Sequence, residues 1–263
     1  MKLAARVEGV GLVGPGLAGW EAARAILAGQ APYSHEATKI PAPEALPAVE
    51  RRRAGKSVKL ALAAGIAAAA DAKREARDLT AVFASSTGDG ENLHAICEAL
   101  ASDDRLISPT RFHNSVHNAP SGYWGIATGA TPPADSLAAF DASFGAGLVE
   151  ALGRIASEPD RGVVLISYDA PYPEPLHATR PIPDGFAAAL VLVRPSGAAH
   201  GMQITLETTP EPPSTMGDAA LEALRREIPA ARALPLLALL ASGRPGRTVI
   251  EYLDGVSLAV TAA

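Results

Sequence analysis

Ser143 is the residue whose type and surroundings are best suited to chemistry in this chain. It follows a short apolar run that ends at Phe140, and apolar residues recur at helical spacing from Leu148 onward. This pattern predicts a buried strand that turns sharply into a helix, with Ser143 at the turn beside the free N–H groups of the helix N-terminus. Because those N–H groups stabilise an oxyanion, the position suits a nucleophile.

Two interpretations of Ser143 follow from the residues alone. A serine before a helix commonly caps it by accepting a hydrogen bond from a free N–H group. Alternatively, Ser143 is a hydrolase nucleophile of the G-x-S-x-G type, with Asp169 and His177 following in that chain order. Asp141 replaces the first glycine of the motif, and the two partners lie only a short loop apart. A serine-dependent acyltransferase or thioesterase is therefore one open hypothesis.

Two further motifs are incomplete. Gly9, Gly11 and Gly14 fit G-x-G-x-x-G, but the acidic residue that a dinucleotide site needs about 20 residues later falls in a loop-like stretch. His113 and His117 have the spacing of one helix face, but no third ligand lies at metalloenzyme spacing. We therefore expect no cofactor and no metal site.

The order of segments along the chain resembles the N-terminal half of β-ketoacyl synthases, the condensing enzymes of the thiolase fold. The glycine turn of 6-RVEGVGLVGPG-16, the 107-ISPTRF-112 segment, the Ser143 turn and 180-RPIPDGF-186 follow one another as in that family. The resemblance covers roughly residues 5 to 195. It implies an α/β, thiolase-like layered fold in one domain, 1–263, with a largely complete N-terminal half (1–195) and a strongly reduced C-terminal remnant (196–263).

The resemblance places Ser143 where the family carries its acyl-accepting cysteine. The single cysteine, Cys97, lies at the apolar spacing of a predicted helix, so we expect it in the core. Neither catalytic histidine of the family has a counterpart, since His200 is the only histidine after Arg194. The condensing triad is thus absent, and Ser143 is expected to be inert, because a hydroxyl needs an adjacent base for activation.

Within this family, the chain resembles a short member of the chain-length-factor branch, which serves type II polyketide and aryl polyene pathways. Members of this branch lack the cysteine and pair with an active ketosynthase. The resemblance implies a heterodimer with a full-length ketosynthase, in which this chain helps to shape the acyl tunnel, and an acyl carrier protein as a further candidate partner. A homodimeric acyl-binding or scaffold protein is the other open alternative.

By the same resemblance, residues 107–145 lie at the two-fold interface and beside the acyl tunnel. The candidate contact residues in this stretch are Phe112, His113, Asn114, His117, Asn118, Tyr123, Trp124, Phe140 and Phe144. Tyr123 and Trp124 have an equally good alternative as core aromatics of a helix, because aromatic side chains serve both cores and interfaces.

Hydrophobic periodicity predicts the elements that must position these residues. Strands are predicted at 6–13, 79–85, 135–141, 162–168, 186–194, 201–208, 247–252 and 255–261. Helices are predicted at 18–28, 56–73, 90–101, 119–128, 144–157, 217–227 and 232–241, and a surface loop at 30–50. This mixture indicates helices covering a sheet.

Composition narrows the class of protein. With 263 residues, 48% hydrophobic and 19% charged, the chain can bury a core, and one cysteine argues against a disulfide scaffold. A net charge of −5 argues against nucleic acid as a partner. The basic cluster Arg51–Arg53 with Lys56 is either a solvated helix start or a site for an acidic partner. Without a long apolar leader or a membrane span, the expected location is cytoplasmic.

Overall fold

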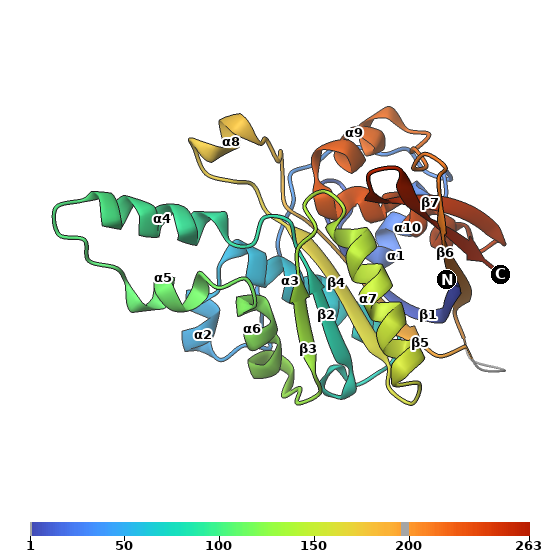
Figure 1. Ribbon diagram of the computed structural model, residues 1–263, viewed down its shortest axis with the longest axis horizontal. Helices are drawn as coiled ribbons and strands as arrows, with labels where there is room; N and C mark the ends of the chain where they lie inside the picture. Colours follow the sequence, from blue (N-terminus) through green and yellow to red (C-terminus); the bar gives the residue numbers. More distant parts are fainter. Residues whose placement is uncertain (1, 196–199) are drawn as a thin grey trace.

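A single mixed sheet of eight strands runs through the computed structural model, which describes residues 2–195 and 200–263 (Figure 1). The strand order is β3-β2-β4-β5-β1-β6-β8-β7. The strands are β1 (Lys2–Val13), β2 (Thr80–Ala84), β3 (Ala134–Leu137), β4 (Val163–Asp169), β5 (Phe186–Val193), β6 (Met202–Thr209), β7 (Gly246–Leu253) and β8 (Val256–Ala262). All eight predicted strands are confirmed, although β3 is shorter than expected. The start of the predicted C-terminal remnant, 196–199, lies outside the described residues.

All seven predicted helices are also present, together with shorter ones. The helices are α1 (Trp20–Leu27), α2 (Ala48–Arg53), α3 (Lys56–Asp71), α4 (Gly90–Ala101), α5 (Pro109–Asn114), α6 (Ala119–Thr128), α7 (Ser143–Ser157), α8 (Leu176–Thr179), α9 (Ala219–Glu227) and α10 (Leu234–Ser242), with 3-10 turns η1 (Ala76–Asp78) and η2 (Pro229–Ala233). The sequence analysis missed α2, α5 and α8, which are too short to show a helical period. For α5 a signal existed, because Ser108 caps it and Pro109 opens it.

Helices cover both faces of the sheet (Figure 1). One core joins α1, α7, η2 and α10 to one face, and a second core joins α3 and α6 to the other. Side chains of β4 alternate between them: Leu165 packs in the first core, while Val164 and Ile166 pack in the second. Every residue of β4 and β5 is buried, as expected for central strands covered on both sides. The predicted α/β layered architecture is confirmed.

The paired glycines of β1 serve packing. A Cβ atom added at Gly9 would collide with the backbone carbonyl oxygen of Ala68, and one at Gly11 would collide with that of Ala64. Both alanines belong to α3, so these glycines let a helix lie directly on the strand. The G-x-G spacing therefore belongs to a strand interior and not to a dinucleotide-binding turn.

The two edges of the sheet differ. At β7, the backbone N–H and C=O of Val249 are both bonded by Ser214, at 2.9 Å each, so the segment before α9 covers this edge. At the opposite edge, β3 pairs with β2 in parallel and with no other described strand. The strands after residue 200 thus extend the sheet at one edge, which Ser214 covers. At the other edge, the outer backbone groups of β3 pair with no described strand.

The β7–β8 hairpin also packs against the start of α7. A Cβ atom added at Gly145 would collide with the backbone carbonyl oxygen of Glu251 on β7. Gly145 therefore permits the close approach of the hairpin to the helix that carries Ser143.

This contact predicts a strong difference between two glycines of α7. Gly145→Ala should lower the free energy of unfolding by about 1–3 kcal/mol, because the added methyl group forces a backbone shift. Gly153→Ala is the matched control, since its new Cβ would meet no atom within 4 Å. It should leave stability unchanged or raise it by up to about 1 kcal/mol through helix propensity. Urea denaturation measures both, and equal effects would contradict the packing described.

Candidate functional site

Ser143 is fully buried as the first residue of α7. Its Oγ donates a hydrogen bond to the carbonyl oxygen of Phe140 at 2.7 Å and accepts one from the N–H of Ala139 at 3.0 Å. The N-cap position belongs to Ala142, which makes no side-chain cap bond. The helix-cap interpretation of Ser143 is therefore wrong, because its hydroxyl bonds back onto the preceding turn and not forward to the helix N–H groups.

Asp169, the predicted acid partner of Ser143, is fully buried at the end of β4. Its Oδ1 accepts hydrogen bonds from Ser85 Oγ, Ser86 N–H and Thr87 N–H at 3.1, 2.8 and 2.9 Å. Its Oδ2 accepts one from the N–H of Ala230 at 2.8 Å. Asp169 thereby joins the loop after β2 to η2.

The three residues of the hydrolase hypothesis are not linked. None of the hydrogen bonds that Ser143 and Asp169 make within the described residues involves His177, which lies on α8. Burial raises the pKa of Asp169 to about 6, although its hydrogen-bond donors act in the opposite direction. The carboxyl group thus has a structural role at the carboxyl end of β4.

Charged side chains surround the turn before Ser143. Asp141 forms ion pairs with Arg180 at 2.6 Å and with Arg232 at 3.4 Å, and Arg232 also pairs with Glu251 of β7. The guanidinium carbon of Arg180 lies 3.7 Å from the centroid of the Phe140 ring. Asp141, which replaces the first glycine of the hydrolase motif, is therefore an ion-pair residue.

Four of the predicted contact residues lie in the protein interior. Asn114, Tyr123, Trp124 and Phe144 are all buried. The amide of Asn114 donates to the carbonyl oxygen of Arg53 at 2.9 Å and accepts from the Tyr123 hydroxyl at 3.1 Å. Trp124 packs edge-to-face on Phe83. The structure thus places Tyr123 and Trp124 in the core, where the alternative interpretation put them.

The other predicted contact residues lie at the surface. Phe112 and Phe140 are each 66% exposed, and His113 and Asn118 are exposed as well. His117 is half-buried, with Nε2 3.1 Å from the carbonyl oxygen of Ser85. The partner contact predicted for this group therefore rests on its exposed members.

Exposed apolar side chains gather in the same part of the chain. Among the described residues, eight of the ten large apolar side chains that are exposed lie between residues 93 and 176: Leu93, Leu100, Leu106, Phe112, Val116, Ile126, Phe140 and Leu176. Several belong to the arm formed by α4 and α5, which extends away from the sheet (Figure 1). The sequence analysis did not single out Leu106, whose signal was an apolar residue in a charged loop. We call these eight residues the apolar surface.

Comparison with known proteins identifies the family. The model of the β-ketoacyl synthase N-terminal domain matches residues 21–246, which is most of the chain. The chain belongs to the β-ketoacyl synthase family. A search of the curated proteins finds no significant match.

Solved structures of ketosynthase complexes share the fold. A chain of the ketosynthase ApeO in complex with its chain length factor ApeC, from Xenorhabdus doucetiae, matches with a TM-score of 0.74 at 23% identity over 98% of this chain and 99% of that one. The ishigamide ketosynthase/chain length factor gives 0.70 at 15%, covering 99% of each chain. The AntDE:AntF complex, a type II carrier protein with its hexaketide-bound ketosynthase, gives 0.74 at 10%, over 100% of this chain and 99% of that one. The predicted thiolase-like fold is confirmed.

The core position predicted for Cys97 in this ketosynthase-family chain is also wrong. Cys97 is exposed, not buried in the core. It lies on α4, which projects from the sheet and buries only Asn92 and Ile96. Hydrophobic periodicity identified the helix correctly. The apolar face of this helix does not pack against the sheet, because the helix projects away from it, so the position of Cys97 on that face did not bury it.

The other predicted surface features have ordinary partners. Arg51, Arg53 and Lys56 of the basic cluster pair with Glu44, Glu50 and Glu91. Within the described part of the chain, no group of three potential ligands is placed to hold a metal ion, and no helix is long and apolar enough to cross a bilayer.

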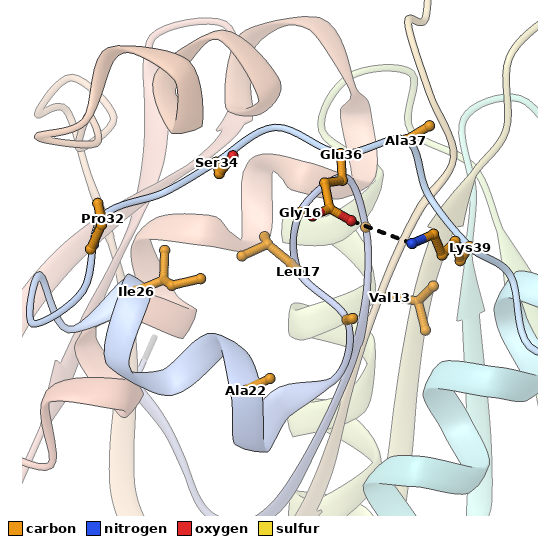
Figure 2. Close-up of a pocket in the computed structure, with 12 residues that line it drawn as sticks. Val13, Gly16, Leu17, Ala22, Ile26, Pro32, Ser34, Glu36, Ala37 and Lys39 are labelled. Carbon is orange, nitrogen blue, oxygen red and sulfur yellow. Dashed lines mark hydrogen bonds and ion pairs between the residues drawn. The ribbon is translucent and has the colours of Figure 1, made fainter.

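A hollow of about 300 Å³ lies at the end of β1 (Figure 2). Val13, Leu17, Ala22 and Ile26 contribute apolar lining, and the exposed Glu36–Lys39 ion pair stands beside it. None of the predicted contact residues lines this hollow.

The buried hydroxyl of Ser143 predicts that no acyl-enzyme forms there. After incubation with an acyl-thioester, intact mass should show no adduct on a Cys97→Ala chain, a background needed because the exposed thiol of Cys97 exchanges with thioesters. An adduct that disappears when Ser143→Ala is added would contradict this prediction and restore the serine-enzyme hypothesis.

The raised pKa of Asp169 predicts how stability depends on pH. Because the folded state holds this proton more tightly than the unfolded chain does, the stabilisation is complete below about pH 4 and is lost as pH rises through about 6. The free energy of unfolding should fall by up to about 3 kcal/mol over that range. Asp169→Asn should abolish this slope, whereas Asp160→Asn, at an exposed turn, should retain it. An unchanged slope in Asp169→Asn would contradict the assignment.

Proposed function

We propose that this chain is a non-condensing subunit that pairs with an active β-ketoacyl synthase and, like a chain length factor, helps to shape the tunnel for the growing acyl chain. The pathway would be a polyketide, fatty acid or polyene pigment synthesis. The open edge at β3 is the observation that carries the proposal. Support also comes from the structural neighbours, which include ketosynthases in complex with chain length factors and with a carrier protein.

An unpaired strand edge is a strong reason to expect a partner. Such an edge offers N–H and C=O groups to any other strand and is a liability unless it is covered. This chain covers its β7 edge with Ser214 and leaves β3 uncovered within the described residues. We infer that a strand of the partner ketosynthase covers β3, so that one sheet continues across both subunits.

The apolar surface favours the same face for docking. Contiguous exposed apolar patches mark interaction sites in proteins. Phe140, which closely follows β3, places one member of this surface next to the open edge in the chain. A partner that pairs with β3 would therefore also bury part of the apolar surface.

The division of labour follows from the site around Ser143. This chain has no cysteine at the turn, and the one hydroxyl there is buried and bonded to the backbone. In this proposal the partner supplies the cysteine and histidines, and an acyl carrier protein delivers the substrate. We further infer that residues 1–263 act as one domain, because β6, β8 and β7 belong to the same sheet as the earlier strands. In this proposal the part after residue 195 is a reduced form of the second half of the family fold. The cytoplasmic location expected from the sequence belongs to this proposal.

Purification of the tagged chain from its native cells tests the proposal. A stoichiometric ketosynthase with an intact cysteine and two histidines should copurify, and native mass should give one copy of each. Recovery of the chain alone, or as a homodimer, would overturn the heterodimer and favour the scaffold alternative.

The register of β3 predicts which backbone position the partner needs. The N–H groups of Ala81 and Ser85 donate to the carbonyl oxygens of Pro133 and Leu137, so alternate residues face β2 and the N–H of Ser136 faces outward. Ser136→Pro should abolish copurification of the ketosynthase with little loss of stability, because an edge strand tolerates proline where its N–H faces solvent. Ser136→Ala keeps the N–H and should bind normally. Normal binding by Ser136→Pro would show that β3 is not the docking edge.

A further inference from the structure

Phe140 combines an exposed ring with a constrained backbone. The residue is 66% exposed, yet its φ angle is +52°, in the left-handed region that bulky residues rarely occupy. Such a conformation persists only where the surrounding structure imposes it. An exposed aromatic held in this way calls for an explanation beyond solvent contact.

Arg180 is the first element that holds the ring. Its guanidinium lies over the Phe140 ring, 3.7 Å from the centroid, within the range of a cation–π contact. Its Nη2 donates to Ser86 Oγ at 2.8 Å and to Asp141 Oδ1 at 2.6 Å. Because these bonds fix the guanidinium to the loop after β2, the ring rests on a fixed support.

Asp141, in the same turn, has a second ion-pair partner. Arg232 of η2 pairs with Asp141 at 3.4 Å and with Glu251 of β7. The side chains of Arg180 and Arg232 are only 23% and 11% exposed, so these ion pairs are less screened by solvent than surface pairs are. Ser143 adds its bond to the carbonyl oxygen of Phe140. The turn that carries the exposed ring is thus tied to the loop after β2 through Arg180 and to η2 through Arg232.

We propose that Phe140 is a prearranged anchor that enters an apolar pocket of the partner ketosynthase, and that Arg180 is the positioning residue that holds it. This inference rests on the proposed function. The turn directly follows β3, so a partner that covers the edge reaches the ring. Since Arg180 already occupies one face of the ring, the partner contributes an apolar surface to the other face and the ring edge. Holding the ring before binding lowers the ordering cost of association.

The positioning role is tested on the free chain. A 4-fluorophenylalanine placed at position 140 reports the contact through its ¹⁹F chemical shift. In the otherwise wild-type chain the shift should differ from that of the free amino acid, and Arg180→Ala should move it toward the free value. Arg247→Ala is the matched control, since it breaks an exposed pair with Glu211 at the other sheet edge and should change nothing. An unchanged shift in Arg180→Ala would overturn the positioning role, whatever the partner does.

The anchor role is tested with the ketosynthase that copurifies with the wild-type chain. Phe140→Ala should weaken its affinity at least tenfold, and Arg180→Ala about threefold to tenfold. Leu253→Ala, which truncates a side chain 58% exposed on β7, should bind as the wild type does. Normal affinity of Phe140→Ala would overturn the anchor while leaving the heterodimer intact. Failure of the wild-type chain to bind any ketosynthase would instead overturn the proposed function and this inference with it.

Discussion

An open sheet must leave two edge strands, and each exposes backbone groups that another strand can pair with. In this chain the two edges are treated differently. The segment 209–216 lies along β7, where Ser214 occupies both backbone groups of Val249 and Glu211 pairs with Arg247. At β3 there is no such cover among the described residues. The turn that carries the exposed Phe140 follows the uncovered strand in the chain.

The end of the sheet where chemistry was expected is filled by structural contacts. Asp169 uses both carboxylate oxygens to join the loop after β2 to η2. The hydroxyl of Ser143 donates its hydrogen bond to the backbone carbonyl oxygen of Phe140. Gly145 lets the β7–β8 hairpin pack against the first turn of α7. The part of the chain after residue 200 therefore contributes packing at this site.

Most of the architecture could be predicted from the sequence because central strands and long helices have clear periodicities. Continuous apolar runs identified β4 and β5, and apolar residues at helical spacing identified α7. Periodicity could not say which amphipathic helix meets the sheet, so Cys97 was wrongly placed in the core. Short helices such as α5 carry too few residues for a pattern, and only the Ser108–Pro109 cap marked it.

The site was predicted less well, because its properties arise from tertiary contacts. No local pattern indicates that the hydroxyl of Ser143 turns back to Phe140, or that Arg180, Asp141 and Arg232 meet there. The exposed residues Phe112 and Phe140 were named through resemblance to a family, whereas the open edge beside them appears only in the sheet order.

Hydrogen exchange tests most directly whether β3 is the docking edge. Amide exchange would be followed in the free chain and in its complex with the copurified ketosynthase. The account predicts that the amides of Ala134 and Ser136, which face away from β2, exchange readily in the free chain and become protected in the complex, whereas those of 246–253 are unchanged. Equal exchange of the Ala134 and Ser136 amides in both states, with protection elsewhere, would contradict the account.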